Sequence, residues 1–169
     1  IYCGSNIYFD PDMAAQLRDR VERSGVAFMM ELPRRFAPAT LRLKELMATR
    51  LGKPRLLFCH RRLPNEFLDV RGAKPTPLRS QHELVELIDW CRYLVGREPT
   101  WVQAIRHPSR NDLNQSDYQV LSLGFGDPES ELDSVLAQIS CGAYMPTGWQ
   151  EVIAYRPPAA VQVSCEKGT

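Results

Sequence analysis

Beyond Pro99 the sequence contains four strand-like segments in succession, with no helical pattern between any two of them. These segments are 101–105, 118–125, 136–144 and 160–165. Parallel neighbouring strands need a long crossover connection, usually a helix, whereas antiparallel strands need only a turn. This part of the chain therefore predicts an open, largely antiparallel sheet. The turn residues at 124–128 fit a hairpin, because Glu129 stands where a dinucleotide loop requires its third glycine.

Near the N-terminus the pattern is different and predicts a βαβ unit. Residues 1–7 read as the end of a strand and a loop. Asp10 and Pro11 are typical of a helix start, and Gly25 is placed to end that helix. The apolar run at 26–32 then predicts a short strand covered on both faces, as in a parallel sheet. We place the end of this unit at about residue 38.

Between these two parts the sequence predicts two main helices and one more strand. The first helix runs from Pro38 to Leu51, a strand follows at 55–60, and residues 63–79 read as a long exposed loop. A capping box at Ser80 and Glu83 predicts the start of the second helix, and Gly96 its end. Its apolar stripe consists of Leu84, Leu87, Ile88, Cys91, Leu94 and Val95. The fold class is therefore α+β, with a sheet of about five strands.

The composition is that of a folded globular protein and excludes a disordered chain. The chain has 169 residues, 44% of them hydrophobic and 24% charged, so it can bury a core and is not disordered. It has no apolar stretch of 18 residues, which predicts no membrane span. Five dispersed cysteines are typical of small buried side chains in a reducing, cytoplasmic protein. The chain starts without Met inside strand-like residues, which predicts a piece of a longer protein.

Charge is unevenly distributed along the chain. Residues 34–62 contain nine Lys and Arg and one Glu, a net charge of +8, whereas residues 111–141 contain six acids and no Lys or Arg. A basic segment can receive the phosphates of a dinucleotide or a nucleic acid. It can equally face the acidic segment within or between subunits. Because the net charge is only +1 and the basic segment lacks interleaved aromatic residues, we predict no nucleic-acid and no membrane partner.

The polar side of the second main helix is the strongest candidate for chemistry. His82, Glu86, Asp89 and Tyr93 form a narrow stripe opposite the apolar face. An imidazole, two carboxylates and a phenol in line can move protons or bind polyols. The alternative is an ordinary solvated helix face. The sequence contains no Cys/His cluster of metal-ligand spacing, so we predict no metal site.

The order of motifs resembles the Gfo/Idh/MocA family of NAD(P)-dependent oxidoreductases, and the resemblance extends over essentially the whole chain. Residues 35–38 match the family's Arg-aromatic-x-Pro signature, and residues 10–32 resemble the helix and last strand of its Rossmann domain. The remaining matches are residues 43–54, residues 89–99 (D-x-x-R-aromatic-L-x-G-x-x-P) and residues 166–169 (G-x-K-G-like).

The resemblance implies a truncated oxidoreductase. Residues 1–38 would be the tail of a Rossmann-type dinucleotide-binding domain, and 39–169 an incomplete substrate and oligomerisation domain. The glycine-rich loop and the lysine of the family's Glu-Lys-Pro motif would lie before Ile1. NAD or NADP would therefore bind through the missing domain, with no certain cofactor residue in this segment. The substrate would be a sugar, a polyol or a related secondary alcohol or ketone, and subunits would associate through the open face of the sheet.

The resemblance also implies the site residues. The family commonly carries Asp-x-Gly-x-His-x-x-Asp on the helix in question, with the His as acid/base. Aligning the last Asp on Asp89 puts Glu86 at the His position and His82 at the first Asp position. Glu86 and His82 are then the catalytic candidates, and Arg35, Asp89 and Tyr93 the substrate-binding candidates. Because the identities are changed, a non-catalytic ligand-binding or dimerisation module is the alternative. We expect the segment alone to be inert.

Overall fold

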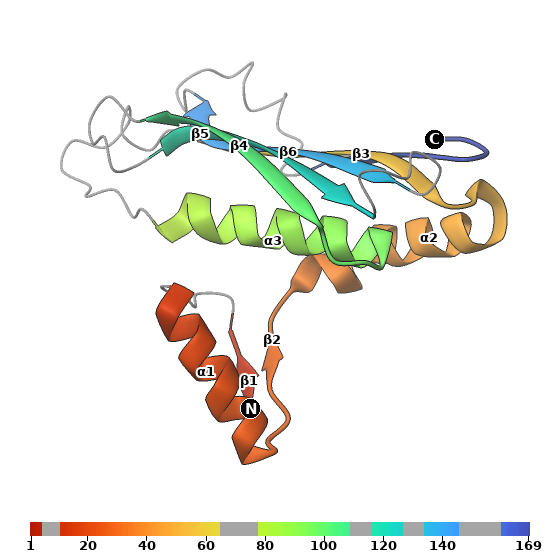
Figure 1. Ribbon diagram of the computed structural model, residues 1–169. Helices are drawn as coiled ribbons and strands as arrows, with labels where there is room; N and C mark the ends of the chain where they lie inside the picture. The colour runs from red at the N-terminus through yellow and green to blue at the C-terminus, as the bar shows by residue number, and fades with distance from the viewer. Residues whose placement is uncertain (5–10, 65–77, 109–115, 127–133, 146–159) are drawn as a thin grey trace.

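A computed structural model describes residues 1–4, 11–64, 78–108, 116–126, 134–145 and 160–169. They are arranged in three layers (Figure 1). A five-stranded sheet forms the first layer, two helices lie on one of its faces, and an N-terminal βαβ unit lies on the far side of those helices. No helix in these ranges is long and apolar enough to cross a membrane.

The sheet has the strand order β4-β5-β6-β3-β7. Its strands are β3 (Pro54–Pro64), β4 (Trp101–Pro108), β5 (Ser116–Phe125), β6 (Val135–Met145) and β7 (Ala160–Cys165). Three of its neighbouring pairs are antiparallel, and only β3 and β6 run parallel. The predicted α+β class and the four strand segments after Pro99 are therefore confirmed. Gly126, directly after β5, has a φ of 105°, a left-handed conformation that favours glycine, and the rest of the predicted turn lies outside the described residues.

The core lies between this sheet and helix α3 (Leu78–Val95). The predicted apolar stripe faces β3 and β6, and its members Leu87, Cys91 and Leu94 are at most 2% exposed. Burial of one such leucine stabilises the fold by about 1.5–3 kcal/mol. Gly96 ends the helix with a φ of 75°, as predicted. The start differs, since α3 begins at Leu78 and Ser80 therefore lies inside the helix, not at its N-cap.

The first main helix is divided in two. Helix α2 (Pro38–Leu46) continues into a π-helical turn, η2 (Met47–Leu51), which ends at Gly52 with a φ of 78°. A side chain at Gly52 would meet Glu166, because a Cβ built there lies 2.8 Å from a Glu166 carboxylate oxygen. This glycine therefore allows the turn after β7 to pack beside the end of the helix.

The N-terminal unit consists of β1 (Tyr2–Cys3), α1 (Pro11–Ser24) and β2 (Met29–Met30), and its two strands pair in parallel. This is the predicted βαβ connection. The prediction of a strand covered on both faces is wrong for the described chain, since Val26 and Met29 are 44% and 48% exposed. A sheet of two strands of two residues each cannot enclose both faces of either strand. The predicted helix start at Asp10 lies outside the described residues.

Cysteines behave as the sequence predicts. All five are free thiols, and Cys59, Cys91 and Cys141 are buried between α3 and the sheet. Burial raises the pKa of Cys141 to about 12, so its thiol stays protonated and acts as a small apolar group. Most of the predicted loop at 63–79 lies outside the described residues.

Candidate functional site

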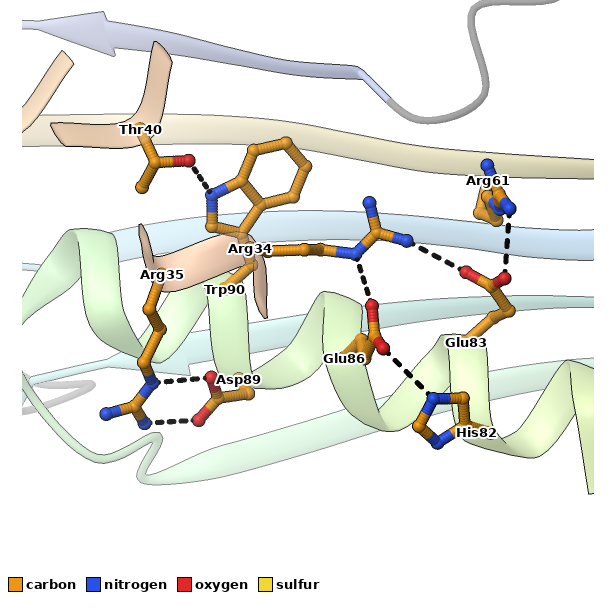
Figure 2. Close-up of polar contacts among 9 residues, drawn as sticks. All are labelled: Arg34, Arg35, Thr40, Arg61, His82, Glu83, Glu86, Asp89 and Trp90. Atoms are coloured by element: carbon orange, nitrogen blue, oxygen red, sulfur yellow. Dashed lines mark hydrogen bonds and ion pairs between the residues drawn. The ribbon is translucent and has the colours of Figure 1, made fainter. Parts of the chain in front are cut away.

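A 3-10 turn, η1 (Pro33–Phe36), joins β2 to α2 and contacts α3. It presents two consecutive arginines, Arg34 and Arg35, to the polar side of α3 (Figure 2). Proline at the first position of both η1 and α2 fixes the backbone on either side of these arginines. The linker between the two parts of the fold is therefore attached to the helix that carries the predicted site.

Arg34 belongs to a chain of alternating charges that we call the His82 chain. His82 Nε2 lies 3.0 Å from Glu86 Oε1, and Glu86 Oε2 lies 2.8 Å from Arg34 Nε. Arg34 Nη2 then lies 2.8 Å from Glu83 Oε2, and Glu83 Oε1 lies 3.0 Å from Nη2 of Arg61 on β3. Figure 2 shows this chain running from β3 across to the imidazole. Its members are His82, Glu86, Arg34, Glu83 and Arg61.

Arg35 makes a separate contact, which we call the Arg35–Asp89 pair. Its Nε donates a hydrogen bond of 2.7 Å to Asp89 Oδ2, and its Nη2 bonds the other oxygen. This hydrogen bonding to Asp89 raises the pKa of Arg35 above its ordinary value. Arg92 lies 3.7 Å from the same carboxylate and also pairs with Glu98. Arg35 thus grips the buried Asp89 carboxylate with two nitrogens, whereas Arg92 makes its two-nitrogen contact with Glu98.

Each η1 arginine also lies over an aromatic ring of α3. The Arg34 guanidinium carbon is 5.5 Å from the centre of the Trp90 ring, and that of Arg35 is 5.4 Å from the centre of the Tyr93 ring. Trp90 Nε1 donates a hydrogen bond of 3.0 Å to Oγ1 of the buried Thr40. These contacts tie η1, α2 and α3 together.

The predicted stripe is therefore not a solvated helix face. Glu86 is 9% exposed and Asp89 5%, because the η1 arginines cover them. The structure brings His82 together with Glu86, and Arg35 together with Asp89 and Tyr93. The side chain of His82 keeps 26% of its surface exposed, against 10% for Glu86.

Sequence reasoning missed three members of the His82 chain. Glu83 was interpreted only as part of a capping box, whereas Arg34 and Arg61 were counted within the basic segment. The spacing of Glu83 and Glu86, three residues apart on one helix face, was the available signal.

The described side chains show partners for the basic segment, but they do not test its pairing with the acidic segment. Cations of the basic segment pair with α3 carboxylates, with Glu45 and with Glu166. The acidic side chains of 111–141 all lie outside the described side chains. Most of the basic charge near α3 is therefore already neutralised within the fold.

Two further features lie outside the stripe. A pocket of about 320 Å³ lies between β1, β2 and η1, lined by Tyr2, Met29, Glu31, Leu32, Pro33, Phe36 and Ala37. Its only charged side chain is a carboxylate, which repels phosphates, so these residues do not fit a pyrophosphate group. The described ranges contain no group of three or more His, Cys, Asp and Glu that could bind a metal.

Both histidines outside α3 lie on the sheet. His107 is exposed on the edge strand β4. His60 lies on β3 with its Nε2 buried and, among the described residues, without a hydrogen-bond partner. Burial, followed by the nearby charge of Arg62, lowers the pKa of His60.

Comparison with known proteins identifies the architecture. No protein-family model and no curated protein matches the chain. Among solved structures, scyllo-inositol dehydrogenase from Lactobacillus casei, with bound NAD(H) and scyllo-inositol, is 16% identical with a TM-score of 0.66. The match covers 99% of this chain and 48% of that one.

Two other solved structures agree. Myo-inositol 2-dehydrogenase from Lactobacillus plantarum is 15% identical with a TM-score of 0.68, and covers 99% of this chain and 48% of its own. UDP-N-acetylglucosamine 3-dehydrogenase from Acidithiobacillus ferrooxidans is 15% identical with a TM-score of 0.65, and covers 98% and 46%. The chain thus spans about half the length of these enzymes, and it has the fold of the corresponding half of Gfo/Idh/MocA-type inositol and sugar dehydrogenases.

Proposed function

We propose that this chain is the substrate-side portion of an NAD(P)-dependent oxidoreductase that acts on a sugar, a polyol or a related secondary alcohol or ketone. The observation that carries the proposal is the His82–Glu86 pair on α3, with Arg34 of η1 beside Glu86. A histidine paired with an anchored carboxylate is suited to exchange a proton with a substrate hydroxyl. The fold shared with inositol and sugar dehydrogenases supports the proposed reaction class.

In this proposal the hydride passes between the substrate carbon and the nicotinamide, which supplies that chemistry when bound. His82 and Glu86 handle the hydroxyl proton. Arg35, Asp89 and Tyr93 form the neighbouring wall, and their mutual contacts support a role in shaping that wall. NAD or NADP is held by residues outside the described chain, because the described residues offer no phosphate-binding set.

The test uses the protein that carries this chain. Titration with NADH and NADPH, followed by fluorescence, measures cofactor affinity, and a panel of inositols, hexoses and aminosugars measures turnover. We expect cofactor binding and a polyol or sugar substrate, with turnover lost in Glu86→Ala and His82→Gln and unchanged in Glu45→Gln. A protein with no affinity for either cofactor contradicts the proposal. The 169-residue chain alone is expected to bind no NADH and to be inert.

One observation favours the alternative, a non-catalytic ligand-binding or dimerisation module. Glu86 stands at the position where the family carries the His that acts as acid/base. Binding of a cofactor or a polyol without turnover, unaffected by changes at Glu86, would support this alternative.

A further inference from the structure

Resting on the proposed function, we infer a division of roles in which Nδ1 of His82 is the atom that exchanges the proton. Glu86 then fixes the imidazole and does not touch the substrate. Arg34 is the positioning residue that holds Glu86 in place. The sequence alone had put the catalytic emphasis on Glu86.

The choice of nitrogen follows from the partner of the other one. His82 Nε2 lies 3.0 Å from a carboxylate oxygen of Glu86, and an ionised carboxylate only accepts hydrogen bonds. Nε2 therefore carries the hydrogen in the neutral ring, which leaves the lone pair on Nδ1. No ion pair engages Nδ1 within the described ranges. His82 is also the more exposed member of the pair, so a substrate reaches the imidazole first.

Glu86 is unsuited to contact the substrate itself. One of its oxygens faces the imidazole, and the other lies 2.8 Å from the Arg34 guanidinium. Glu86 therefore lies between two basic groups, with one at each of its oxygens. A rotation of Glu86 toward a substrate would break both contacts and leave the charge of Arg34, 19% exposed, with one carboxylate fewer.

Arg34 fixes Glu86 because it is itself held on three sides. It contacts Glu86 and Glu83 with different nitrogens, and its guanidinium lies over the Trp90 ring. Arg61 on β3 holds the far oxygen of Glu83, so the His82 chain is anchored in the central sheet. Arg35 is a matched control, because it attaches the same linker to the same helix yet contacts no member of the His82 chain.

The test reads the tautomer of His82 by long-range ¹H–¹⁵N NMR of the imidazole in the full chain. We expect the wild-type ring to carry its hydrogen on Nε2 alone at a pH where it is neutral. Arg34→Gln should move both nitrogens toward the mixed tautomers of a free histidine, and Arg35→Gln should leave them unchanged. The exposed His107 is an internal reference.

Two results overturn the inference: a wild-type His82 with its hydrogen on Nδ1, or equal shifts in Arg34→Gln and Arg35→Gln. Circular dichroism checks folding, and Arg34→Lys, which keeps the charge but not both contacts, is the second variant if Arg34→Gln does not fold. It should give an intermediate tautomer shift. In the cofactor-loaded protein, Arg34→Lys should lower kcat by about tenfold to a hundredfold with KM unchanged.

These readouts separate the two proposals. The NMR result does not depend on turnover, so a fixed Nε2–H tautomer in a protein without cofactor affinity overturns the proposed function alone. Turnover that survives His82→Gln and is lost in Glu86→Gln overturns the division of roles alone.

Discussion

At the scale of single residues, the buried carboxylate of Glu86 should contribute more to the free energy of unfolding than an exposed glutamate does. Glu86→Gln keeps the shape but leaves His82 without its anion and Arg34 with Glu83 alone. We expect the free energy of unfolding to fall by about 1–3 kcal/mol, because the partners stay largely buried. Urea unfolding measures it. The exposed pair of Arg42 and Glu45 is the control, and Glu45→Gln should change stability by less than about 0.5 kcal/mol. Equal effects would contradict the burial argument.

His60 should make stability depend on pH. The pKa of its folded form lies below the ordinary 6.5, because burial and then Arg62 disfavour the charged ring. The unfolded chain therefore takes up this proton first. The contribution of the neutral His60 to the free energy of unfolding is fully present above pH 6.5 and is lost as pH falls from 6.5 through the folded pKa.

His60→Gln should reduce this dependence. Between about pH 7.5 and pH 5.5 we expect the variant to lose less stability than the wild type, because glutamine takes up no proton in this range. Urea unfolding at the two pH values measures the difference. His107→Gln, at an exposed position of the same sheet, should leave the wild-type dependence intact. An unchanged dependence in His60→Gln would show that other groups cause it.

Single residues also show which features of the site could be predicted from the sequence and which could not. The stripe His82, Glu86, Asp89 and Tyr93 could be found from 100° spacing, since helix geometry decides it. Its burial could not, because burial comes from Arg34 and Arg35, about fifty positions away along the chain. A helical projection cannot distinguish a solvated carboxylate from one covered by a distant guanidinium.

At the scale of elements, the packing between β4 and β5 requires a glycine at position 124, because the Trp101 ring lies over it. Trp101 is the register partner of Gly124, and a Cβ built on Gly124 would lie 1.9 Å from Trp101 Nε1. Gly124→Ala should therefore destabilise the chain by about 1–3 kcal/mol through overpacking. In a double-mutant cycle with Trp101→Ala, the alanine at 124 should cost little, because the ring is gone. Additive effects would contradict this packing.

Element predictions succeeded where a local pattern coincides with a packed face. The apolar stripe of α3 and the strand at 160–165 are examples, since period and burial agree there. The apolar run at 26–32 failed because its length suggested an enclosed strand, whereas pairing extends over only Met29 and Met30. Pairing depends on a partner strand, which a local pattern does not contain.

At the scale of the whole molecule, the open face of the sheet should associate with a second copy of the chain. Alternation puts Leu57 and Cys59 toward α3 and Phe58 on the other face. Strand register puts Trp101 and Ile105 on that same face. These three side chains are 41–69% exposed, and an apolar surface of this kind favours an interface.

Light scattering after size exclusion should therefore give the mass of a dimer for the wild-type chain. Phe58→Glu puts a charge in the middle of the open face and should shift the chain to a monomer, since a buried unpaired charge is costly. Val85→Glu is the control, because Val85 is 50% exposed on α3, away from the sheet, and should leave the dimer intact. A monomeric wild type, or equal loss of dimer in both variants, would place any association elsewhere. If Val85→Glu keeps the dimer and Phe58→Glu loses it, the interface lies on the sheet face opposite the His82 chain. His82 then stays accessible in the assembly.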